Sequence, residues 1–412
     1  MSMLKDYMLI VISDMHFSDG SSSHNISHRA FSHFFDHIKR GLTDECKELI
    51  IVFAGDTFDL LRSEHWMTVE DAEKPWAEND QGSRIEGQGA GSRDERSASI
   101  KPYQKHLGTI FKNILNENES SLTIIKQVED MFRPVPVKIH TIPGNHDRML
   151  VEIDNYKGML GNYLGNISIL DASYENRNYG VRIRHGHEYD TYNFEEEGRV
   201  PVGDVNTTEL FVRLPFEIKK QYPELANELR CVEDIRPQWR VFDYLGSTYP
   251  EGEINRCIRE ATEQTIDRFF KIPFVKSWIE NHDTASILDD ADKLEYMLRI
   301  FKILPLTWAE KLLKTFSHFE MGEQHYEEMA EKEEALYVVY GHTHTENVSF
   351  LRITEDQHSY YVNTGTWRER ITTSNKGVFS RYKTLTYAVF YTKEERHTEF
   401  PSFELWNGML RE

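Results

Sequence analysis

Short apolar runs and amphipathic segments alternate through the first third of the chain. Met8–Ser13, Leu49–Phe53 and Val135–Ile142 are apolar runs of strand length, which predicts buried strands. The segment Ile26–Ile38 lies between the first two runs. It carries apolar residues at helical spacing, and Gly41 marks the end of the helix. Strand, helix and strand in this order predict a βαβ unit with a right-handed crossover.

The remaining core elements follow the same logic. Tyr103–Phe132 has helical spacing and predicts one long helix, or two helices interrupted near Asn116–Ser121. Gln81–Ser97 is polar and glycine-rich, which predicts a mobile loop. Apolar runs later in the chain predict six further strands at Ile167–Leu170, Val181–Arg184, Leu336–Tyr340, Val348–Ile353, Tyr360–Val362 and Leu385–Tyr391.

A long segment of different texture separates two of these strands. From 194 to 334, apolar residues recur at helical spacing, which predicts a helical insertion with breaks at Pro215, Pro237, Pro250 and Pro273. The chain is therefore divided into residues 1–193, 194–334 and 335–412, where the first and last form one core. We expect the insertion to be a cap that restricts the substrate; an oligomerisation arm is the alternative.

Side chains that bind metals follow the first strand directly. Asp14 and His16 stand two positions apart, and in a continuing strand they would point to the same side. A carboxylate oxygen and an imidazole together make half of a metal site. Four later stretches repeat this pattern of strand, turn and polar ligands: Gly55-Asp56-x-x-Asp59, Gly144-Asn145-His146-Asp147, His185-Gly186-His187 and Gly341-His342-x-His344.

Taken in this order and chain context, the five stretches resemble the sequence blocks of the calcineurin-like metallophosphoesterase family. The resemblance covers residues 8–190 and 336–391 and leaves the insertion out. It implies an α/β, four-layer metallophosphoesterase fold, in which two packed mixed β-sheets are flanked by helices. It also implies an enzyme that hydrolyses a phosphate ester through attack by a hydroxide that bridges two metal ions.

The resemblance also implies roles for individual residues. The first metal would be held by Asp14, His16, Asp56 and His344, and the second by Asp56, Asn145, His185 and His342. Asp56 would bridge the two metals. His146 would stabilise the phosphoryl group or act as general acid, with Asp147 orienting it.

Three further residues in or beside these blocks have other expected roles. We expect His187 to line the site rather than to bind a metal. Asp59 is expected to be a supporting or structural carboxylate. Arg148 is a candidate contact for the substrate phosphate, and a solvated turn residue is an equal alternative.

Ligand chemistry and charge narrow the choice of cofactor and substrate. Mixed nitrogen and oxygen ligands favour two divalent transition-metal ions, with Mn first and Fe, Zn or Ni as alternatives. The formal net charge of −20 and a pI near 5.4 argue against non-specific binding of nucleic acid or anionic membranes. We therefore expect a small or medium-sized phosphoester as substrate.

Two rival functions remain. A nuclease, for which nucleic acid would be a substrate only, needs a basic groove, and its candidates are Arg182, Arg184, Arg368, Arg370, Lys376, Arg381 and Lys383. A non-catalytic scaffold is disfavoured by the intact set of ligands.

The remaining sequence features concern location. The 3 cysteines, Cys46, Cys231 and Cys257, are far apart and predict reduced thiols. No apolar run reaches transmembrane length. We expect a cytoplasmic protein.

Overall fold

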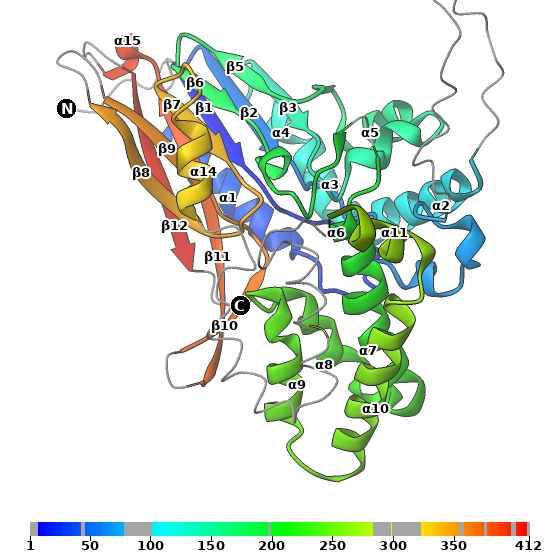
Figure 1. Ribbon diagram of the computed structural model, residues 1–412. Coiled ribbons are helices and arrows are strands. Elements are labelled where there is room, and N and C mark those ends of the chain that lie inside the picture. Colours follow the sequence, from blue (N-terminus) through cyan, green and yellow to red (C-terminus); the bar gives the residue numbers. More distant parts are fainter. Residues whose placement is uncertain are drawn as a thin grey trace, which may run out of the picture.

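Two mixed β-sheets with helices beside them make up the core, so the α/β class is confirmed (Figure 1). The computed structural model describes residues 7–42, 46–77, 101–196, 199–282, 298, 323–353, 358–374, 377–396 and 401–409. Gln81–Ser97, for which we expect a mobile loop, lies outside the described residues. So does much of the later part of the insertion.

The larger sheet has seven strands in the order β10-β11-β1-β2-β3-β4, and β12 pairs with β11. Strands β1 to β4 are parallel, and β11 runs antiparallel to β1, with Met8 opposite Tyr391. The bounds are β1 (Tyr7–Ile12), β2 (Glu48–Ala54), β3 (Val137–Ile142), β4 (Ile167–Ile169), β10 (Glu369–Thr373), β11 (Phe379–Tyr391) and β12 (Ser402–Met409).

The smaller sheet has five strands in the order β5-β6-β7-β9-β8. Its central strands β6, β7 and β9 are parallel, and the outer strands run antiparallel to their neighbours. The bounds are β5 (Tyr174–Asn176), β6 (Val181–Ile183), β7 (Tyr337–Tyr340), β8 (Glu346–Ile353) and β9 (His358–Thr364). Strands β5, β10 and β12 are not among the strands that the apolar runs predict. Strand β5 has three residues, and β10 has a single apolar residue, Ile371.

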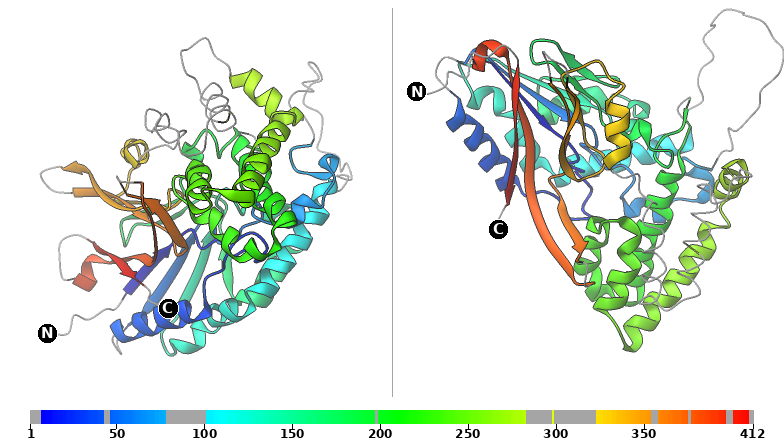
Figure 2. Two further views of the ribbon diagram at one scale, coloured as in Figure 1. Left: turned by 90° about the horizontal axis from the view of Figure 1, so that it is seen from below. Right: turned by 60° about the vertical axis from the view of Figure 1, so that its left-hand side comes forward.

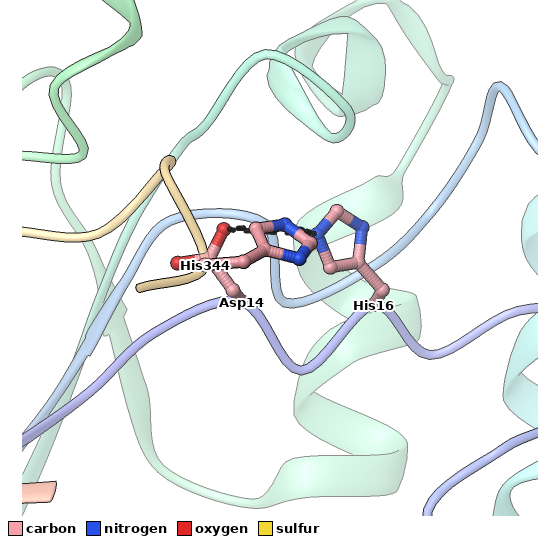
Figure 3. A group of neighbouring side chains, drawn as sticks. All are labelled: Asp14, His16 and His344. Atoms are coloured by element: carbon pink, nitrogen blue, oxygen red, sulfur yellow. Dashed lines mark hydrogen bonds and ion pairs between the residues drawn. The ribbon is translucent and has the colours of Figure 1, made fainter. Parts of the chain in front are cut away.

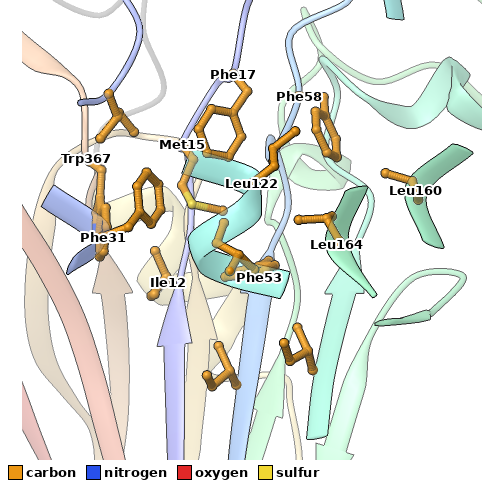
Figure 4. Packing of buried hydrophobic residues seen from close by; sticks show 14 of the residues in the cluster. Ile12, Met15, Phe17, Phe31, Phe53, Phe58, Leu122, Leu160, Leu164 and Trp367 are labelled. Carbon is orange, nitrogen blue, oxygen red and sulfur yellow. The ribbon is translucent and has the colours of Figure 1, made fainter. Parts of the chain in front are cut away.

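The alternation of β1 places the two sheets face to face. Leu9 and Val11 belong to a buried cluster that also contains Val339 and Val362 of the smaller sheet. Met8, Ile10 and Ile12 face the other way and join the cluster under the helices, part of which Figure 4 shows. Both faces of β1 are therefore buried, which explains its unbroken run of apolar residues.

Helices cover the outer faces of both sheets. The larger sheet is covered by α1 (His28–Gly41), α2 (Pro102–Glu117), α3 (Glu119–Lys126) and α5 (Tyr156–Leu164), and the smaller one by α14 (Glu323–Ala330). The order of layers is helix, sheet, sheet, helix. The break between α2 and α3 at Asn118 confirms the two-helix alternative for this region. The short helices are α4 (Val128–Met131) and α15 (Lys393–Arg396), with 3-10 turns at Glu64–Met67, Asp71–Glu73, Arg148–Glu152 and His187–Tyr189.

Within the predicted insertion, α14 packs on the smaller sheet, and the described residues from Val202 to His282 are helical and pack as a bundle beside the sheets (Figures 1 and 2). Its apolar cluster also contains Trp76 and Ile371 from outside the insertion, so the bundle shares its core with both flanking parts of the chain. Its elements are α6 (Val202–Asn206), a π-helix η6 (Thr207–Val212), α7 (Arg213–Gln221), α8 (Ala226–Leu229), α9 (Val241–Thr248), α10 (Gly252–Phe269) and α11 (Pro273–His282), with 3-10 turns at Pro223–Leu225, Arg230–Asp234 and Gln238–Arg240.

One predicted helix break is wrong. Pro215 lies inside α7, and the helical chain continues from Val202 to Gln221 without interruption. The π-helix Thr207–Val212 comes directly before α7, where its wider turn accommodates a residue without an amide proton. By contrast, Pro250 lies between α9 and α10, and Pro273 begins α11.

Two further findings concern the whole molecule. The cysteines are free and buried. Over the residues that the structure describes, no helix combines the length and apolar character needed to cross a bilayer.

Candidate metal centre

The turn after β1 does not continue as a strand. β1 ends at Ile12, and Asp14 and His16 have φ angles of 53° and 46°. The expectation that strand alternation brings these two side chains together is therefore wrong. The left-handed backbone conformation at each of these residues bends the chain sharply. Backbone hydrogen bonds from Asp14 and His16 to the turn after β2 stabilise this shape.

Left-handed backbone recurs at the other turns of the site. Asp56, His342 and His344 have φ angles of 49°, 69° and 59°. Each such residue other than glycine costs about 1 kcal/mol or more, so a protein retains it where the surroundings or a function require it. Of the six residues of this kind in the described chain, five are predicted metal ligands, so the strained backbone is concentrated at this candidate site.

Two glycines let these turns approach the ligands. A Cβ atom on Gly144 would lie 2.2 Å from Oδ1 of Asp56, and one on Gly341 would lie 2.4 Å from Oδ2 of Asp14. Any other residue would push the carboxylate away. The glycines of the third and fifth stretches are therefore explained by close packing against ligands.

The first group of candidate ligands combines residues that are far apart in the chain. Nε2 of His344 lies 3.3 Å from Oδ1 of Asp14 and 3.0 Å from Nε2 of His16 (Figure 3). All three side chains are buried. The buried Oδ1 of Asp14 has no hydrogen-bond partner, so it is available to a cation.

The second group shares Asp56 with the first. Oδ2 of Asp56 lies 3.5 Å from Nε2 of His16 and 3.2 Å from Nε2 of His185. The same His185 nitrogen lies 3.2 Å from Oδ1 of Asn145. Asp56 therefore lies between the two groups, as a bridging ligand would.

His342 stands slightly apart from this cluster. Its Nε2 lies 3.0 Å from Oδ2 of Asp190, and its Nδ1 is buried without a hydrogen-bond partner. An imidazole held by a carboxylate at one nitrogen offers the other as a ligand. The sets of three donors that lie mutually close do not include His342. The structure thus brings together Asp14, His16, Asp56, Asn145, His185 and His344, with His342 beside them.

Histidines are the neighbours that lower the pKa of Asp14 and Asp56 most. Burial would raise the pKa of Asp14, but His344 and His185 hold it well below its usual value. The same holds for the pKa of Asp56, which burial would raise and His185 and His146 lower. Burial lowers the pKa of His185, yet Asp56 and Asp14 raise it to about 10. A metal cation at this place would replace the protons as the source of positive charge.

Asp59 is the residue that orients His146. Its Oδ1 lies 2.9 Å from Nδ1 of His146, and its Oδ2 lies 3.0 Å from Nδ1 of His16. The expectation that Asp147 orients His146 is wrong. Asp147 instead accepts hydrogen bonds from the backbone amides of Thr57, Phe58 and Gly144. Its carboxylate therefore links the second turn to the third.

The two weaker candidates have partners of other kinds. Arg148 makes a two-pronged ion pair with Asp204, at 3.0 and 2.5 Å, and donates to the carbonyl of Asn145. Its guanidinium is thus engaged with a carboxylate, which argues against a role in phosphate contact. His187 lies with its ring centre 5.4 Å from that of His185 and is in none of the close donor sets among the described residues.

Sequence reasoning did not identify several residues of the site. Asp190 supports His342, and it lies only three residues after the fourth stretch, so its position was a usable signal. Arg236 of the insertion lies with Nη2 3.0 Å from Nδ1 of His344. No motif in the insertion marks that residue.

The donor set fits transition metals. It combines imidazole nitrogens with carboxylate and amide oxygens, and it includes two buried donor atoms without hydrogen-bond partners, Oδ1 of Asp14 and Nδ1 of His342. Residues that could hold a metal ion are therefore present, and all lie at one edge of the two sheets.

Comparison with protein-family models gives no match for this chain, and comparison with curated proteins gives no significant match either. The family resemblance therefore rests on the five stretches and on the arrangement of their residues.

Proposed function

We propose that this protein is a phosphoester hydrolase that uses two divalent transition-metal ions. We also propose that its layers are those of the calcineurin-like metallophosphoesterase fold. The observation that carries the proposal is the convergence of five strand-end turns, with ligands from residues 14 to 344, on one buried group of aspartates and histidines. Chance gives such pairs singly, but it does not bring five of them to one place.

The ligands divide between two ions. Asp14, His16 and His344 would hold the first, and Asn145, His185 and His342 the second, with Asp56 shared between them. Bound ions of this kind neutralise charge at phosphorus and activate water at neutral pH. Manganese suits the mixed set of nitrogen and oxygen donors.

His146 is the proposed general acid. Its Nδ1 is held by Asp59, which leaves Nε2 to donate a proton to the leaving group. Asp59 also holds His16, so one carboxylate fixes both an acid and a ligand. His146 forms a close donor set with His16 and Asp56, and a role as a third ligand is therefore the alternative.

A small or medium-sized phosphoester is the proposed substrate class. All five arginines of the basic groove that a nuclease would need are paired with carboxylates. Arg368 pairs with Asp234, and Arg370 with Glu346. Arg182, Arg184 and Arg381 likewise have glutamate partners. Paired arginines attract a polyanion weakly, which disfavours nucleic acid as the substrate.

A hydrolysis panel tests the proposal. Protein treated with chelator and then supplied with Mn(II) is assayed on p-nitrophenyl phosphate, bis-p-nitrophenyl phosphate, nucleotides and single-stranded DNA. We expect metal-dependent hydrolysis of at least one small ester. Preference for DNA would favour the nuclease, and inactivity on the whole panel would contradict the proposal.

A further inference from the structure

A buried arginine joins the insertion to the carboxylate that orients His146. Nη1 of Arg62 lies 3.4 Å from Oδ2 of Asp59, and its Nε lies 3.0 Å from Oε2 of Glu233. Arg62 and Asp59 belong to the turn after β2, whereas Glu233 belongs to the insertion. The exposed fractions of Asp59, Glu233 and Arg62 are 0%, 1% and 3%. The positive charge of Arg62 therefore lies between a carboxylate of the core and a carboxylate of the insertion.

Each oxygen of Asp59 contacts both Arg62 and a histidine of the candidate site. Oδ1 accepts a hydrogen bond from the backbone amide of Arg62 at 3.0 Å and lies 2.9 Å from Nδ1 of His146. Oδ2 lies near the Arg62 guanidinium and 3.0 Å from Nδ1 of His16. A rotation of this carboxylate would break its contact with His146. Whatever fixes the orientation of Asp59 therefore also fixes the imidazole of His146.

The position of Arg62 depends on the charge of Glu233. Burying a guanidinium is costly unless carboxylates compensate it. Burial would lower the pKa of Arg62, but Asp59 and Glu233 raise it above its usual value. The adjacent carboxylate of Asp234 is bound by Arg368 at 2.8 and 2.6 Å. If Glu233 were neutral, Arg62 would lose one of its two nearest anions and the attraction that holds it between them.

We propose that Glu233 and Arg62 are positioning residues for His146, so that the insertion contributes to catalysis through the orientation of Asp59. This inference rests on the proposed function, in which His146 is the general acid. An acid acts only when it points at the leaving group, and a displacement of about 1 Å can cost roughly a hundredfold in rate. Without the charge of Glu233, the site would keep its ligands but would hold its acid less precisely.

The test compares the full-length wild type with Glu233→Gln, Arg62→Lys, His146→Ala and the double variant Glu233→Gln/His146→Ala. Glu209→Gln is the matched control, because Glu209 is also a buried carboxylate of the insertion and pairs with Lys74 of the core.

Assays are run in Mn(II) at about pH 8, because burial raises the pKa of Glu233 to about 7 and its side chain must be charged in the wild type. The substrates are the nitrophenyl ester that the wild type hydrolyses and the matching phenyl ester. Elemental analysis measures metal per chain, and crystal structures of wild type and Glu233→Gln give the distance between Asp59 and His146.

We expect Glu233→Gln to keep the metal content and KM of wild type while kcat for the phenyl ester falls by about 10-fold. The nitrophenyl ester should lose less, because its better leaving group needs less help from an acid. Arg62→Lys should act in the same direction, since lysine lacks the fork that spans both carboxylates. In the His146→Ala background, Glu233→Gln should change kcat by less than about 2-fold, because the group that it positions is gone. Glu209→Gln should keep the wild-type kcat for both esters.

Several outcomes would overturn the assignment of Glu233 and Arg62 alone. One is the same loss of kcat from Glu233→Gln with and without His146, and another is no loss in either background. Loss of metal from Glu233→Gln would show that it acts on a ligand instead. An unchanged contact between Asp59 and His146 in the crystal structure of Glu233→Gln would also contradict it. A wild type that hydrolyses neither ester would contradict the proposed function, and the crystal structures would still decide whether Glu233 holds Asp59 in place.

Discussion

Asp14 and Asp56 are buried at the metal edge, which is the edge of the two sheets that carries the candidate metal centre. Their partners differ from those of the buried carboxylates of the insertion. Asp14 and Asp56 have histidine neighbours and, within the described chain, no ion pair with lysine or arginine. In the insertion, Asp204 pairs with Arg148, and Glu209 lies 2.5 Å from Lys74 and 2.6 Å from Arg213. Both sets are removed from water, but lysine or arginine forms ion pairs directly with Asp204 and Glu209, whereas at the metal edge Arg62 lies 3.4 Å from Asp59 and not beside Asp14 or Asp56.

This difference distinguishes the carboxylates of the candidate metal centre from the carboxylates that hold the insertion to the core. A buried carboxylate needs compensating charge, and arginine or lysine provides it at any pH that a protein experiences. Histidine can give up its proton, so a cluster of aspartate and histidine can exchange protons for metal cations. Under the proposed function, Asp14 and Asp56 would bind cations, whereas Asp204 and Glu209 pair with basic side chains and hold the insertion in place.

The largest expected effect is that of Asp56→Asn. Replacing the shared carboxylate removes a ligand from both groups, so metal content should fall far below that of wild type and hydrolysis should be lost. Elemental analysis of protein dialysed against Mn(II) and then desalted provides the measurement. Retention of wild-type metal content would show that Asp56 does not bridge.

The matched change in the insertion is Asp204→Asn. It leaves the buried end of the Arg148 ion pair without its charge, which should destabilise the fold by roughly 3 kcal/mol. Metal content should remain that of wild type. Denaturant unfolding with parallel metal analysis checks both. If metal were lost while stability stayed unchanged, the two sets of carboxylates would not differ as described.

His146→Ala tests whether His146 acts as a general acid or as a metal ligand. The variant should keep its metal while turnover falls by roughly a hundredfold, as for loss of a general acid. Steady-state kinetics and elemental analysis on the same sample provide the test. A variant that has lost one metal equivalent would make His146 a ligand instead.

Glu233 offers the smallest effect and a sign that can be checked. Burial raises its pKa from 4.5 to about 7, although Arg62 lowers it. As the pH rises, the unfolded chain loses the Glu233 proton at a lower pH than the folded chain does. The contribution of Glu233 to stability is therefore present at low pH and is lost as the pH rises towards 7.

Glu233→Gln removes that loss. Relative to wild type, its free energy of unfolding should rise by about 1.4 kcal/mol per pH unit between roughly pH 5 and 7. Urea unfolding of both proteins at several pH values measures this difference in the free energy of unfolding. Any cost of the substitution that does not vary with pH leaves the slope unchanged. A difference that does not vary with pH would place the pKa of Glu233 near its ordinary value.

The metal edge and the larger helices could be predicted because their signals are local. Asp14, Asp56 and His344 each lie in the turn that follows an apolar run, and Ile26–Ile38 shows helical spacing within a single element. The left-handed turns that bring Asp14 and His16 together could not be predicted, because a left-handed backbone at residues other than glycine has no local sequence signature.

The contacts that sequence reasoning missed are long-range. Arg236 reaches His344 across 108 positions, and Arg148 finds Asp204 across 56. The family resemblance implies that Asp147 orients His146, whereas the actual partner, Asp59, comes from another turn. Such pairings follow from tertiary packing, which no spacing in the chain specifies.

The most direct test of the central claim is the metal content of the wild-type protein. Chelator-treated protein is reconstituted with Mn(II), desalted and subjected to elemental analysis. A site made by two groups that share Asp56 should retain close to two ions per chain. Protein that retains none would contradict the account of this edge as a metal centre.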